Sequence, residues 1–522
     1  MKPQRRYGIE RRQFLRYVAA VSAIPHIAFQ LEGKAGQPPQ FDTDPFTLGV
    51  TSGDPEPDGT VIWTRLAPSP LEPGGGMQPR PVLVRWEVST DEQFKTVVQQ
   101  GDAVATPQLG HSVHVELHGL KPHHWYYYRF HAGDATSPVG RTRTAPAYDA
   151  MPERMRFAFT SCQHFETGYF NGYPHMQEED LDLVVHLGDY IYEGKGQDDR
   201  PRKHLGEEIE TLNDYRLRYT QYRLDPMLQE AHRRFPWLVT WDDHEFDNNY
   251  ANLVSEQDGI SPEAFLARRM NAYQTYYEFM PLRRRSFPQG PHMTLYRSSR
   301  YGRLAQFQVL DTRQYRTDQP NGDQKSPQVG EALNKQATML GDKQEHWLMG
   351  QLLQSDAQWN ILAQQVMMAA LNRGLEDYGR YSMDQWPGYE ISRRRLLKFL
   401  HERSIPNPVV LTGDIHVNWV NDLLLHSQDE KAPVVGTELV GTSMSSGGNG
   451  GNSIEEYERA AKQNPFVRWY NANRGYVSCE ITPDAWDTHF RVTPFVDKPN
   501  SPILTKASFR IENGIAGAKQ LS

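Results

Sequence analysis

A short apolar run stops at a glycine in the stretch Leu183-Val-Val-His-Leu-Gly-Asp-Tyr-Ile-Tyr-Glu193. Apolar runs of this length, bounded by turn residues, are typical of buried strands. The stretch therefore presents the carboxylate of Asp189 and the phenol of Tyr192 together, just beyond the end of a strand. A carboxylate and a phenol side by side suit a hard trivalent metal ion.

Three other apolar runs end in the same way. They are Arg156-Phe-Ala-Phe-Thr-Ser-Cys162, Trp237-Leu-Val-Thr-Trp-Asp-Asp-His-Glu245 and Pro408-Val-Val-Leu-Thr-Gly-Asp-Ile-His416. Ligands of open α/β sheets bind beyond the carboxyl ends of the strands. One metal-centred crevice, lined by Cys, Asp, Tyr and His side chains, explains all four runs.

Length and charge narrow the possible functions. At 522 residues the chain exceeds the size of one hydrophobic core, so two domains, or one large domain with an appendage, are expected. Its formal net charge of −8 gives no general attraction to nucleic acid, and we expect no nucleic-acid binding. An anionic substrate would have to be captured by metal ions and locally placed arginines. No apolar run reaches the length of a transmembrane helix, so we expect no transmembrane anchor.

The chain has only two cysteines, Cys162 and Cys479. Two residues far apart in sequence define no disulfide framework. Cys162 ends a strand among polar residues, whereas Cys479 alternates with its neighbours as a strand residue does. We expect them to be unbridged, because geometry rather than number decides pairing.

The N-terminus has the order of an export signal. Glu10-Arg-Arg-Gln-Phe-Leu-Arg16 is followed by the weakly apolar Tyr17-Val-Ala-Ala-Val-Ser-Ala-Ile24, and the stretch resembles a twin-arginine signal. We therefore expect residues 1–36 to be a signal segment that engages the twin-arginine export machinery, and the protein to be periplasmic or secreted. The alternative is a basic, disordered N-terminus.

The rest of the chain divides into two patterns. Residues 44–145 alternate as short strands between Pro- and Gly-rich turns, which predicts a β-sandwich. Residues 153–505 alternate strands with amphipathic helices, which predicts a mixed α/β domain, and residues 506–522 are expected to be a C-terminal tail. Helices are expected after Ser261 and Ser453, and over 343–353 and 391–401. By composition, residues 441–451 form a flexible loop, either a plain connector or a phosphate cradle.

With these blocks in order, the chain resembles the alkaline phosphatase D family, a branch related to purple acid phosphatases and other calcineurin-like metallophosphoesterases. The resemblance implies an α/β metallophosphoesterase sandwich preceded by an all-β fibronectin type III or immunoglobulin-like domain. It rests on Phe46-Thr-Leu-Gly-Val-Thr-Ser-Gly-Asp-Pro55, Ile62-Trp-Thr-Arg65, Ser161-Cys-Gln163, Gly188-Asp-Tyr-Ile-Tyr-Glu193, Trp241-Asp-Asp-His-Glu-Phe-Asp-Asn-Asn249, Leu310-Asp-Thr-Arg-Gln-Tyr-Arg316 and Gly413-Asp-Ile-His416.

The same resemblance implies the metals and their ligands. One metal is a ferric ion and its companions are calcium ions, with Asp189 bridging them. The implied iron ligands are Cys162, Tyr192 and His416, and the implied calcium ligands are Asp243, Asn248 and Asp414. These residue types agree with the metals, because calcium takes oxygen ligands whereas thiolate, phenolate and imidazole suit iron.

Three further residues have open roles. His244 is predicted to be catalytic, assisting the leaving oxygen, with a supporting role beside Asp243 as the alternative. His186 lies within its strand and is expected to be a core residue rather than a ligand. Arg313 either binds phosphate or braces a loop.

The expected activity is hydrolysis of phosphate esters by metal-activated water, of the alkaline phosphatase or phosphodiesterase type, for phosphate acquisition. Nucleotides, sugar phosphates and phospholipid headgroups are the candidate substrates. The nearest alternative is a phospholipase D or a specific phosphodiesterase on the same scaffold. An alternative of another class is a secreted binding or adhesion protein whose α/β domain has lost activity, although ligand types converging at strand ends argue against it.

Overall fold

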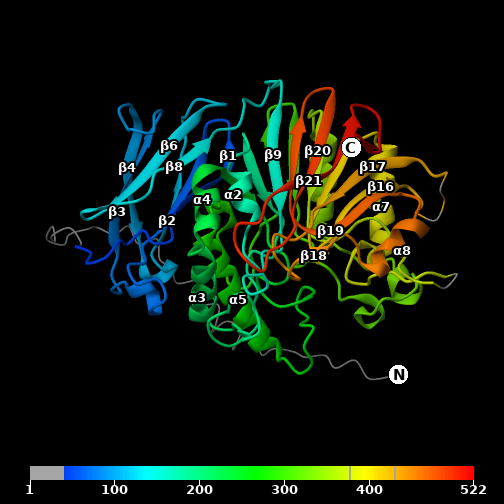
Figure 1. Cartoon of the computed structure of the whole chain (residues 1–522), viewed down its shortest axis with the longest axis horizontal. Helices are drawn as coiled ribbons and strands as arrows, with labels where there is room; N and C mark the ends of the chain where they lie inside the picture. Colours follow the sequence, from blue (N-terminus) through cyan, green and yellow to red (C-terminus); the bar gives the residue numbers. More distant parts are fainter. Residues whose placement is uncertain (1–39, 376–377, 428, 430) are drawn as a thin grey trace.

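Two large sheets, joined by one strand, form the framework of the protein (Figure 1). The computed structural model describes residues 40–375, 378–427, 429 and 431–522. The predicted signal segment lies outside these residues. In Figure 1 the blue and cyan N-terminal strands lie on the left and the yellow strands β16 and β17 on the right, with the orange-red strands β20 and β21 between β9 and the yellow strands.

The first sheet contains the strands that end at the predicted ligands. Its hydrogen-bonded order is β5 (Ser112–Glu116), β2 (Gly59–Arg65), β1 (Val50–Glu56), β11 (Pro236–Val239), β10 (Leu183–His186), β9 (Met155–Thr160), β19 (Val467–Ile481), β20 (Ala485–Thr493), β21 (Leu504–Glu512) and β22 (Lys519–Gln520). Strands β1, β11, β10 and β9 are parallel. Their carboxyl ends therefore lie at one edge. The last two strands correct the expectation of a C-terminal tail over residues 506–522.

The second sheet is mixed as well. Its order is β12 (Arg297–Tyr301), β13 (Ala305–Val309), β14 (Trp359–Ala363), β15 (Pro408–Thr412), β17 (Val434–Val440), β16 (Asn418–Leu424) and the first part of β19, with β18 (Gly450–Gly451) beside β19. Strands β13, β14, β15 and β17 are parallel. Because β19 pairs with β16 and then with β9, it holds the two sheets together along one side.

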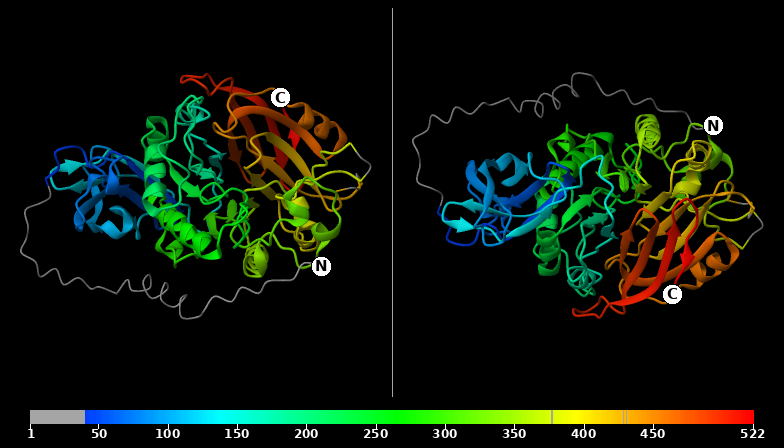
Figure 2. Two further views of the ribbon diagram at one scale, coloured as in Figure 1. Left: turned by 90° about the horizontal axis from the view of Figure 1, so that it is seen from below. Right: turned by 90° about the horizontal axis from the view of Figure 1, so that it is seen from above.

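A core of apolar side chains fills the space between the sheets, with Phe159 and Val185 from the first meeting Phe307 and Leu411 from the second. Helices cover the outer faces (Figure 2). The first sheet packs against α2 (Gly172–Met176), α3 (Leu212–Arg223), α4 (Pro226–Arg234) and α5 (Pro262–Phe279), and the second against α6 (Gly341–Gln354), α7 (Glu390–Glu402) and α8 (Glu455–Gln463). The predicted mixed α/β region is thus confirmed.

The N-terminal strands form two layers. The outer layer pairs β4 (Val97–Ala105) with β3 (Val82–Ser89), then β6 (Trp125–Ala132), which also pairs with β7 (Ala135–Thr136) and β8 (Gly140–Arg143). Val84 and Phe130 of this layer pack against Ile62 and Val113 of the inner one. The inner layer, β5, β2 and β1, continues into the first large sheet through β11. The fibronectin or immunoglobulin-like topology stays a prediction.

The N-termini of α5 and α8 can be compared with the predicted capping residues Ser261 and Ser453. Ser261 is the N-cap of α5, where its Oγ accepts the Ala264 N–H at 3.2 Å and Pro262 opens the helix, as predicted. The Ser453 prediction is wrong, because α8 begins after Ile454 without a side-chain cap. The helices expected over 343–353 and 391–401 are α6 and α7. Short 3-10 helices occur at Pro73–Gly76, Pro107–Leu109, Arg284–Ser286, Pro320–Asp323, Gly330–Leu333 and Trp386–Tyr389.

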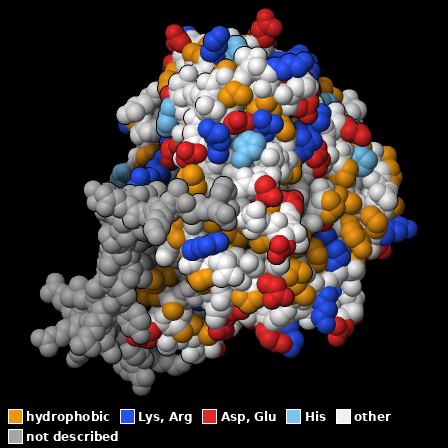
Figure 3. All heavy atoms as spheres, turned by 90° about the vertical axis from the view of Figure 1, so that its left-hand side faces the viewer, with side chains coloured by type: hydrophobic (Ala, Val, Ile, Leu, Met, Phe, Trp, Pro, Cys, Tyr) orange, Lys and Arg blue, Asp and Glu red, His pale blue; other side chains and the backbone are white. Residues whose placement is uncertain are grey.

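The surface is mixed in charge. On the face in Figure 3, basic and acidic side chains are interspersed among small apolar groups. In the part of the chain that the structure describes, no helix has the length and apolarity that crossing a membrane requires.

Candidate metal centre

The predicted ligands lie where parallel strands of both sheets end. Cys162 follows β9, Asp189 follows β10, and Asp414 and His416 follow β15. All four have left-handed backbone conformations, with φ values of 56°, 55°, 63° and 60°. Such conformations are uncommon for residues other than glycine and cost about 1–3 kcal/mol each. The chain is held in these turns by the surrounding structure, and the turns bring the four side chains to one place.

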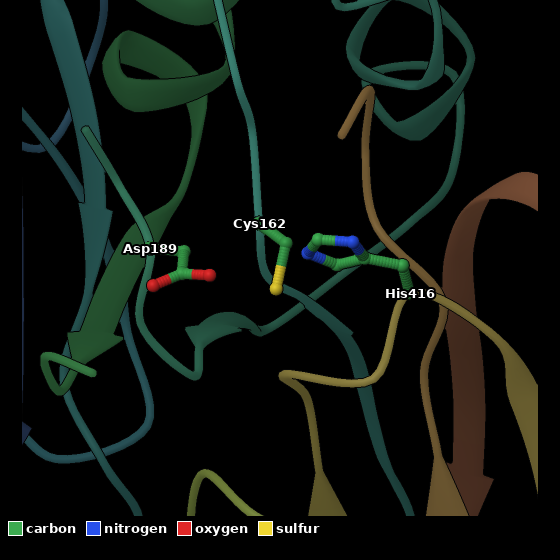
Figure 4. Close-up of side chains that lie close together, drawn as sticks. All are labelled: Cys162, Asp189 and His416. Atoms are coloured by element: carbon green, nitrogen blue, oxygen red, sulfur yellow. The ribbon is translucent and has the colours of Figure 1, made fainter. Parts of the chain in front are cut away.

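Cys162, Asp189 and His416 form the first group of ligands (Figure 4). One donor atom from each lies within 4.8 Å of the others, and the sulfur lies between the carboxylate and the imidazole in the view of Figure 4. The Tyr192 hydroxyl completes the group, because it donates to Asp189 Oδ2 at 2.8 Å and lies 3.2 Å from His416 Nε2. The structure thus brings together the four residues that the resemblance assigns around a ferric ion.

Asp189 also belongs to a second group. Its carboxylate lies within 4.8 Å of donor atoms of Asp243 and His244, and Asp243 in turn lies as close to Asp242 and Asp414. Asp189 therefore stands between the sulfur-containing group and an oxygen-rich group. This position agrees with a carboxylate that bridges two cations.

The carboxyl groups of this cluster are electrostatically frustrated. Burial raises the pKa of Asp189 and Asp242 well above the ordinary carboxyl value, and it raises the pKa of Asp414 to about 6 despite the nearby Arg313. Burial would also raise the pKa of Asp243, but Arg313 and His244 lower it below its ordinary value. The folded protein thus favours protons on most of these groups, or cations in their place.

Several oxygens of the cluster have no hydrogen-bond partner. Among the described residues, Asp189 Oδ1 and Asp242 Oδ2 are buried without a hydrogen-bond partner, and buried Asp243 Oδ1 has only an ion-pair contact with Arg313 Nη2 at 3.5 Å. Buried polar atoms are normally satisfied, because leaving one unpaired costs about 1–3 kcal/mol. Cations bound among these carboxylates would remove that cost. The residues present therefore fit a polynuclear metal centre.

The thiol and the phenol have a separate requirement. Burial, followed by the charge of Asp189, raises the pKa of both Cys162 and Tyr192 well above their ordinary values. Each group needs a cation at its side to lose its proton at neutral pH. The neighbours that carry positive charge include Arg474, whose Nη1 donates to the His416 carbonyl at 2.6 Å, and His244, whose ring centroid lies 4.2 Å from that of Tyr192. A metal ion would supply the missing charge.

His244 lies at the open side of the cluster, with 22 % of its side chain exposed. Its Nδ1 is 2.7 Å from Glu193 Oε2. Burial alone would lower the pKa of His244, but Glu193, Asp243 and Asp189 together raise it well above its ordinary value. The imidazole therefore keeps its proton, while Glu193 fixes the orientation of the ring.

Arg313 lies beneath the cluster with its side chain fully buried. Its guanidinium makes ion pairs with Asp242, Asp243, Asp384 and Asp414. Most of its N–H groups are thus directed at carboxylates of the protein itself. This geometry favours the bracing role over the predicted contact with substrate.

Two predicted positions are less central. Asn248 donates from its side chain to Glu256, and its backbone N–H donates to Glu193 Oε1 at 3.1 Å. Its role as a calcium ligand stays a prediction. His186 is 1 % exposed, and its ring packs against Tyr190 and Trp237. It is a core residue, as predicted, although its Nε2 has no hydrogen-bond partner.

Two further residues, Glu245 and Ser446, support the proposed ligands and are not among the residues predicted from the sequence. Glu245 is buried and accepts three backbone N–H groups, from Asp189 at 3.0 Å, Tyr190 at 2.6 Å and Asp242 at 2.8 Å. Glu245 lies within the motif Trp241–Asn249, where its acidic side chain is the one sign in the sequence of a role at the site. Ser446 places its Oγ 2.7 Å from the Tyr192 hydroxyl. It lies in the segment 441–451, whose buried Thr442, Ser443 and Ser445 also contradict the expectation of a flexible loop.

His164, Glu166 and His204 form another group with donor atoms within 4.8 Å of one another. Here the atoms already have partners. Glu166 Oε1 accepts the backbone N–H groups of Gln197 and His204, and His204 Nε2 lies 3.0 Å from the Tyr222 hydroxyl. We therefore assign this group to anchoring the loop that follows Tyr192.

Comparison with known proteins agrees with this site. Residues 157–490 match the family model described as PhoD-like phosphatase, and residues 33–146 match the model of the PhoD-like phosphatase N-terminal domain. The chain is 50% identical over 489 residues to alkaline phosphatase D of Bacillus subtilis (strain 168), which covers 93% of this chain and 84% of that protein. A solved structure titled "Structure of PhoD" superposes with a TM-score of 0.91 at 49% identity and covers 93% of each chain. The chain belongs to the PhoD-like phosphatase family.

Proposed function

We propose that this protein hydrolyses phosphate esters at the metal centre described above. The observation that carries the proposal is that two buried carboxylate oxygens, Asp189 Oδ1 and Asp242 Oδ2, make no hydrogen bond within the described residues, at the strand ends of a chain 50% identical to an alkaline phosphatase D. Membership of the PhoD-like phosphatase family makes the protein a hydrolase. Its candidate substrates are nucleotides, sugar phosphates and phospholipid headgroups.

The two groups of ligands support two kinds of metal. Cys162, Tyr192 and His416 supply sulfur, phenolic oxygen and nitrogen, which suit ferric iron, whereas Asp243 and Asp414 supply only oxygen, which suits calcium. Asn248 would complete the calcium side. When bound, these ions would provide a hydroxide nucleophile at neutral pH and positive charge to offset that of the phosphoryl oxygens.

His244 is the proposed general acid. Its raised pKa keeps a proton on the ring, and with Nδ1 held by Glu193 the remaining ring nitrogen is available for the leaving oxygen. The Tyr192 ring lies against the imidazole, with 4.2 Å between centroids, and limits its rotation. Arg313 keeps the carboxylates Asp242 and Asp414 in place.

We also propose that the protein acts outside the cytoplasm, in the periplasm or as a secreted enzyme. The basic stretch with Arg11 and Arg12 supports export by the twin-arginine route. Because this route carries folded proteins, it would allow metal insertion before export. A role in phosphate acquisition follows from hydrolysis of released esters at such a location.

The test is turnover by the purified protein loaded with iron and calcium. We expect hydrolysis of p-nitrophenyl phosphate and bis-p-nitrophenyl phosphate, loss of both activities on chelation, and loss of both in Asp189→Asn. Asp487→Asn, which removes a carboxylate of the exposed Arg510 ion pair, is the matched control and should keep full activity. Phosphatidylcholine belongs in the same panel to measure phospholipase activity. A well-loaded, folded protein that hydrolyses none of these esters would refute the proposal in favour of a binding protein.

A further inference from the structure

Ser446 contacts the metal centre from a part of the chain that composition marks as a flexible loop. Its side chain is 1 % exposed, and its Oγ lies 2.7 Å from the hydroxyl oxygen of Tyr192. The Ser446 hydroxyl is not itself one of the proposed metal ligands. The question is where its single proton points.

The neighbours of Ser446 Oγ leave two acceptors for that proton. The backbone N–H of His164 donates to Oγ at 3.2 Å, so the oxygen is already an acceptor. The carbonyl of Cys162 and the hydroxyl oxygen of Tyr192 each lie 2.7 Å away. The carbonyl also accepts the backbone N–H groups of Ser446 at 3.2 Å and Ser445 at 3.4 Å. Tyr192 instead directs its own proton to Asp189, which leaves its oxygen free to accept.

We infer that Ser446 is a positioning residue that donates a hydrogen bond to the phenolic oxygen of Tyr192 and tunes that oxygen as a metal ligand. The inference rests on the proposed function, in which Tyr192 binds the ferric ion. A hydrogen bond to an ionised oxygen is stronger than one to a neutral oxygen, so metal binding by Tyr192 strengthens the contact. Partners that hydrogen-bond to ligands fix their orientation and tune the metal.

The loop around Ser446 is held in place before any ligand binds. Ser443 Oγ donates to the Ser446 carbonyl at 2.8 Å, and the Met444 N–H donates to the Ser161 carbonyl at 2.9 Å. Arg474 donates from Nε to the Gly448 carbonyl at 2.9 Å. Gly447 has a φ of 79°, and a Cβ there would lie 2.8 Å from Arg474 Nη2. The donor is therefore preorganised, as a tuning residue must be.

The visible spectrum of the iron-loaded protein tests this inference, because a phenolate bound to ferric iron absorbs by charge transfer. Withdrawing the hydrogen bond leaves the phenolate richer in electrons, which lowers the transition energy. We expect Ser446→Ala to move the band to longer wavelength and to weaken iron binding roughly tenfold, measured by competition with a chelator. Ser445→Ala is the matched control, because its Oγ donates to the His164 carbonyl at 2.9 Å and has no contact with Tyr192.

The outcomes separate the two proposals. If the iron-loaded parent protein shows no charge-transfer band, and therefore resembles Tyr192→Phe, the assignment of Tyr192 as an iron ligand is refuted. A band that is present in the parent chain and unchanged in Ser446→Ala would overturn only the role of Ser446. Should the alanine variant not fold, Ser446→Gly removes the same hydroxyl, and the same shift is expected.

Discussion

Glu245 accepts the backbone N–H of Asp189 at 3.0 Å, although the two residues follow different strands. The same carboxylate also accepts N–H groups of Tyr190 and Asp242. Glu245 therefore holds the turn after β10, which carries Asp189, in a fixed position relative to the turn after β11, which carries Asp242. The geometry of the bridging ligand thus depends on a residue that is not assigned as a ligand.

Glu245→Gln should destabilise the protein above about pH 8, where the Glu245 carboxyl is ionised in the folded state, and should weaken metal binding. A glutamine has one acceptor oxygen in place of two and would bring an N–H group against a backbone N–H, at a cost of about 1–3 kcal/mol. Urea unfolding and metal titration measure the two effects. Glu438→Gln is the control, because Glu438 is also buried and accepts backbone N–H groups, from Met368 and Ala369. Equal metal affinity in the two variants would contradict the role given to Glu245.

The two cysteines offer an internal comparison. Cys162→Ser should lower the iron content, and with it the charge-transfer colour and hydrolysis, because a serine hydroxyl does not ionise as a thiol does. Cys479→Ser should keep both, since Cys479 is buried in β19 with its sulfur 3.8 Å from Thr488 Oγ1. Absorption spectra and iron content of the two purified variants decide the point. An unchanged iron content together with an unchanged spectrum in Cys162→Ser would exclude the sulfur as a ligand.

The stability of the metal-free protein should fall as the pH rises from about 6.5 to about 8. Burial raises the pKa of Glu245 to about 8, so the folded state holds a proton that the unfolded state, near 4.5, has lost. Stability declines with pH where the folded state binds more protons. Histidines whose pKa burial lowers affect stability only below about 6.5.

Metals should reverse this trend, because they bind the deprotonated ligands. The increase in melting temperature on metal addition should therefore grow with pH, and binding near pH 6 should release protons from groups such as Asp414, whose pKa is about 6. Thermal unfolding with and without metal, and calorimetry in two buffers, measure these effects. A metal-induced stabilisation that does not vary with pH would contradict the assignment.

Arg313→Gln should act through stability rather than substrate affinity. Removing one partner of a buried ion pair costs about 3–5 kcal/mol, and Arg313 serves four carboxylates. Arg510→Gln, at an exposed pair with Asp487, should leave the stability nearly unchanged. Chemical denaturation compares them. A fully stable Arg313→Gln protein with a raised KM would instead indicate contact with the substrate.

His244→Ala should slow hydrolysis most for esters with poor leaving groups. A general acid contributes about 10²–10⁴-fold, and p-nitrophenolate needs it least. Comparing kcat for p-nitrophenyl phosphate and an alkyl phosphate measures the difference. Glu193→Gln should shift the alkaline limb of the pH profile to lower pH, because losing the Glu193 charge lowers the pKa of His244. Equal losses on both esters would argue for a purely structural role.

The positions of the proposed ligands could be predicted from the sequence more completely than those of the residues that support them. The strand ends that present Cys162, Asp189 and His416 follow from short apolar runs, and the structure has strands at each of them. Tyr192 can be predicted to lie at the site because it follows β10 by only a few residues. Ser446 cannot, because its contact with Tyr192 joins residues 254 positions apart and its glycine-rich surroundings are also typical of linkers. Side-chain partners set by tertiary packing leave no periodic signal.

Three other differences between the sequence-based predictions and the structure have identifiable causes. The N-terminus of α8 was misplaced because Ser453 and Glu456 match a capping pattern that the backbone does not use, with Ile454 at the cap position. The expectation of a tail is wrong because β21 pairs with β20 and β22 pairs with β21, and strand pairing is set by the folded structure rather than by the local pattern. The sequence does not decide between the two roles of Arg313, because its four carboxylate partners come together only in the folded protein.

The strand shared by both sheets has a consequence for biosynthesis. β19 pairs with β9, some 320 residues earlier in the chain, and its first half closes the second sheet against β16. A ribosome that has released every assigned ligand has still to deliver this strand before the layers can be fastened together. The strand ends that carry the proposed ligands can therefore be locked together only after residues 467–481 have left the ribosome, later than His416, the last of the proposed ligands to be synthesised.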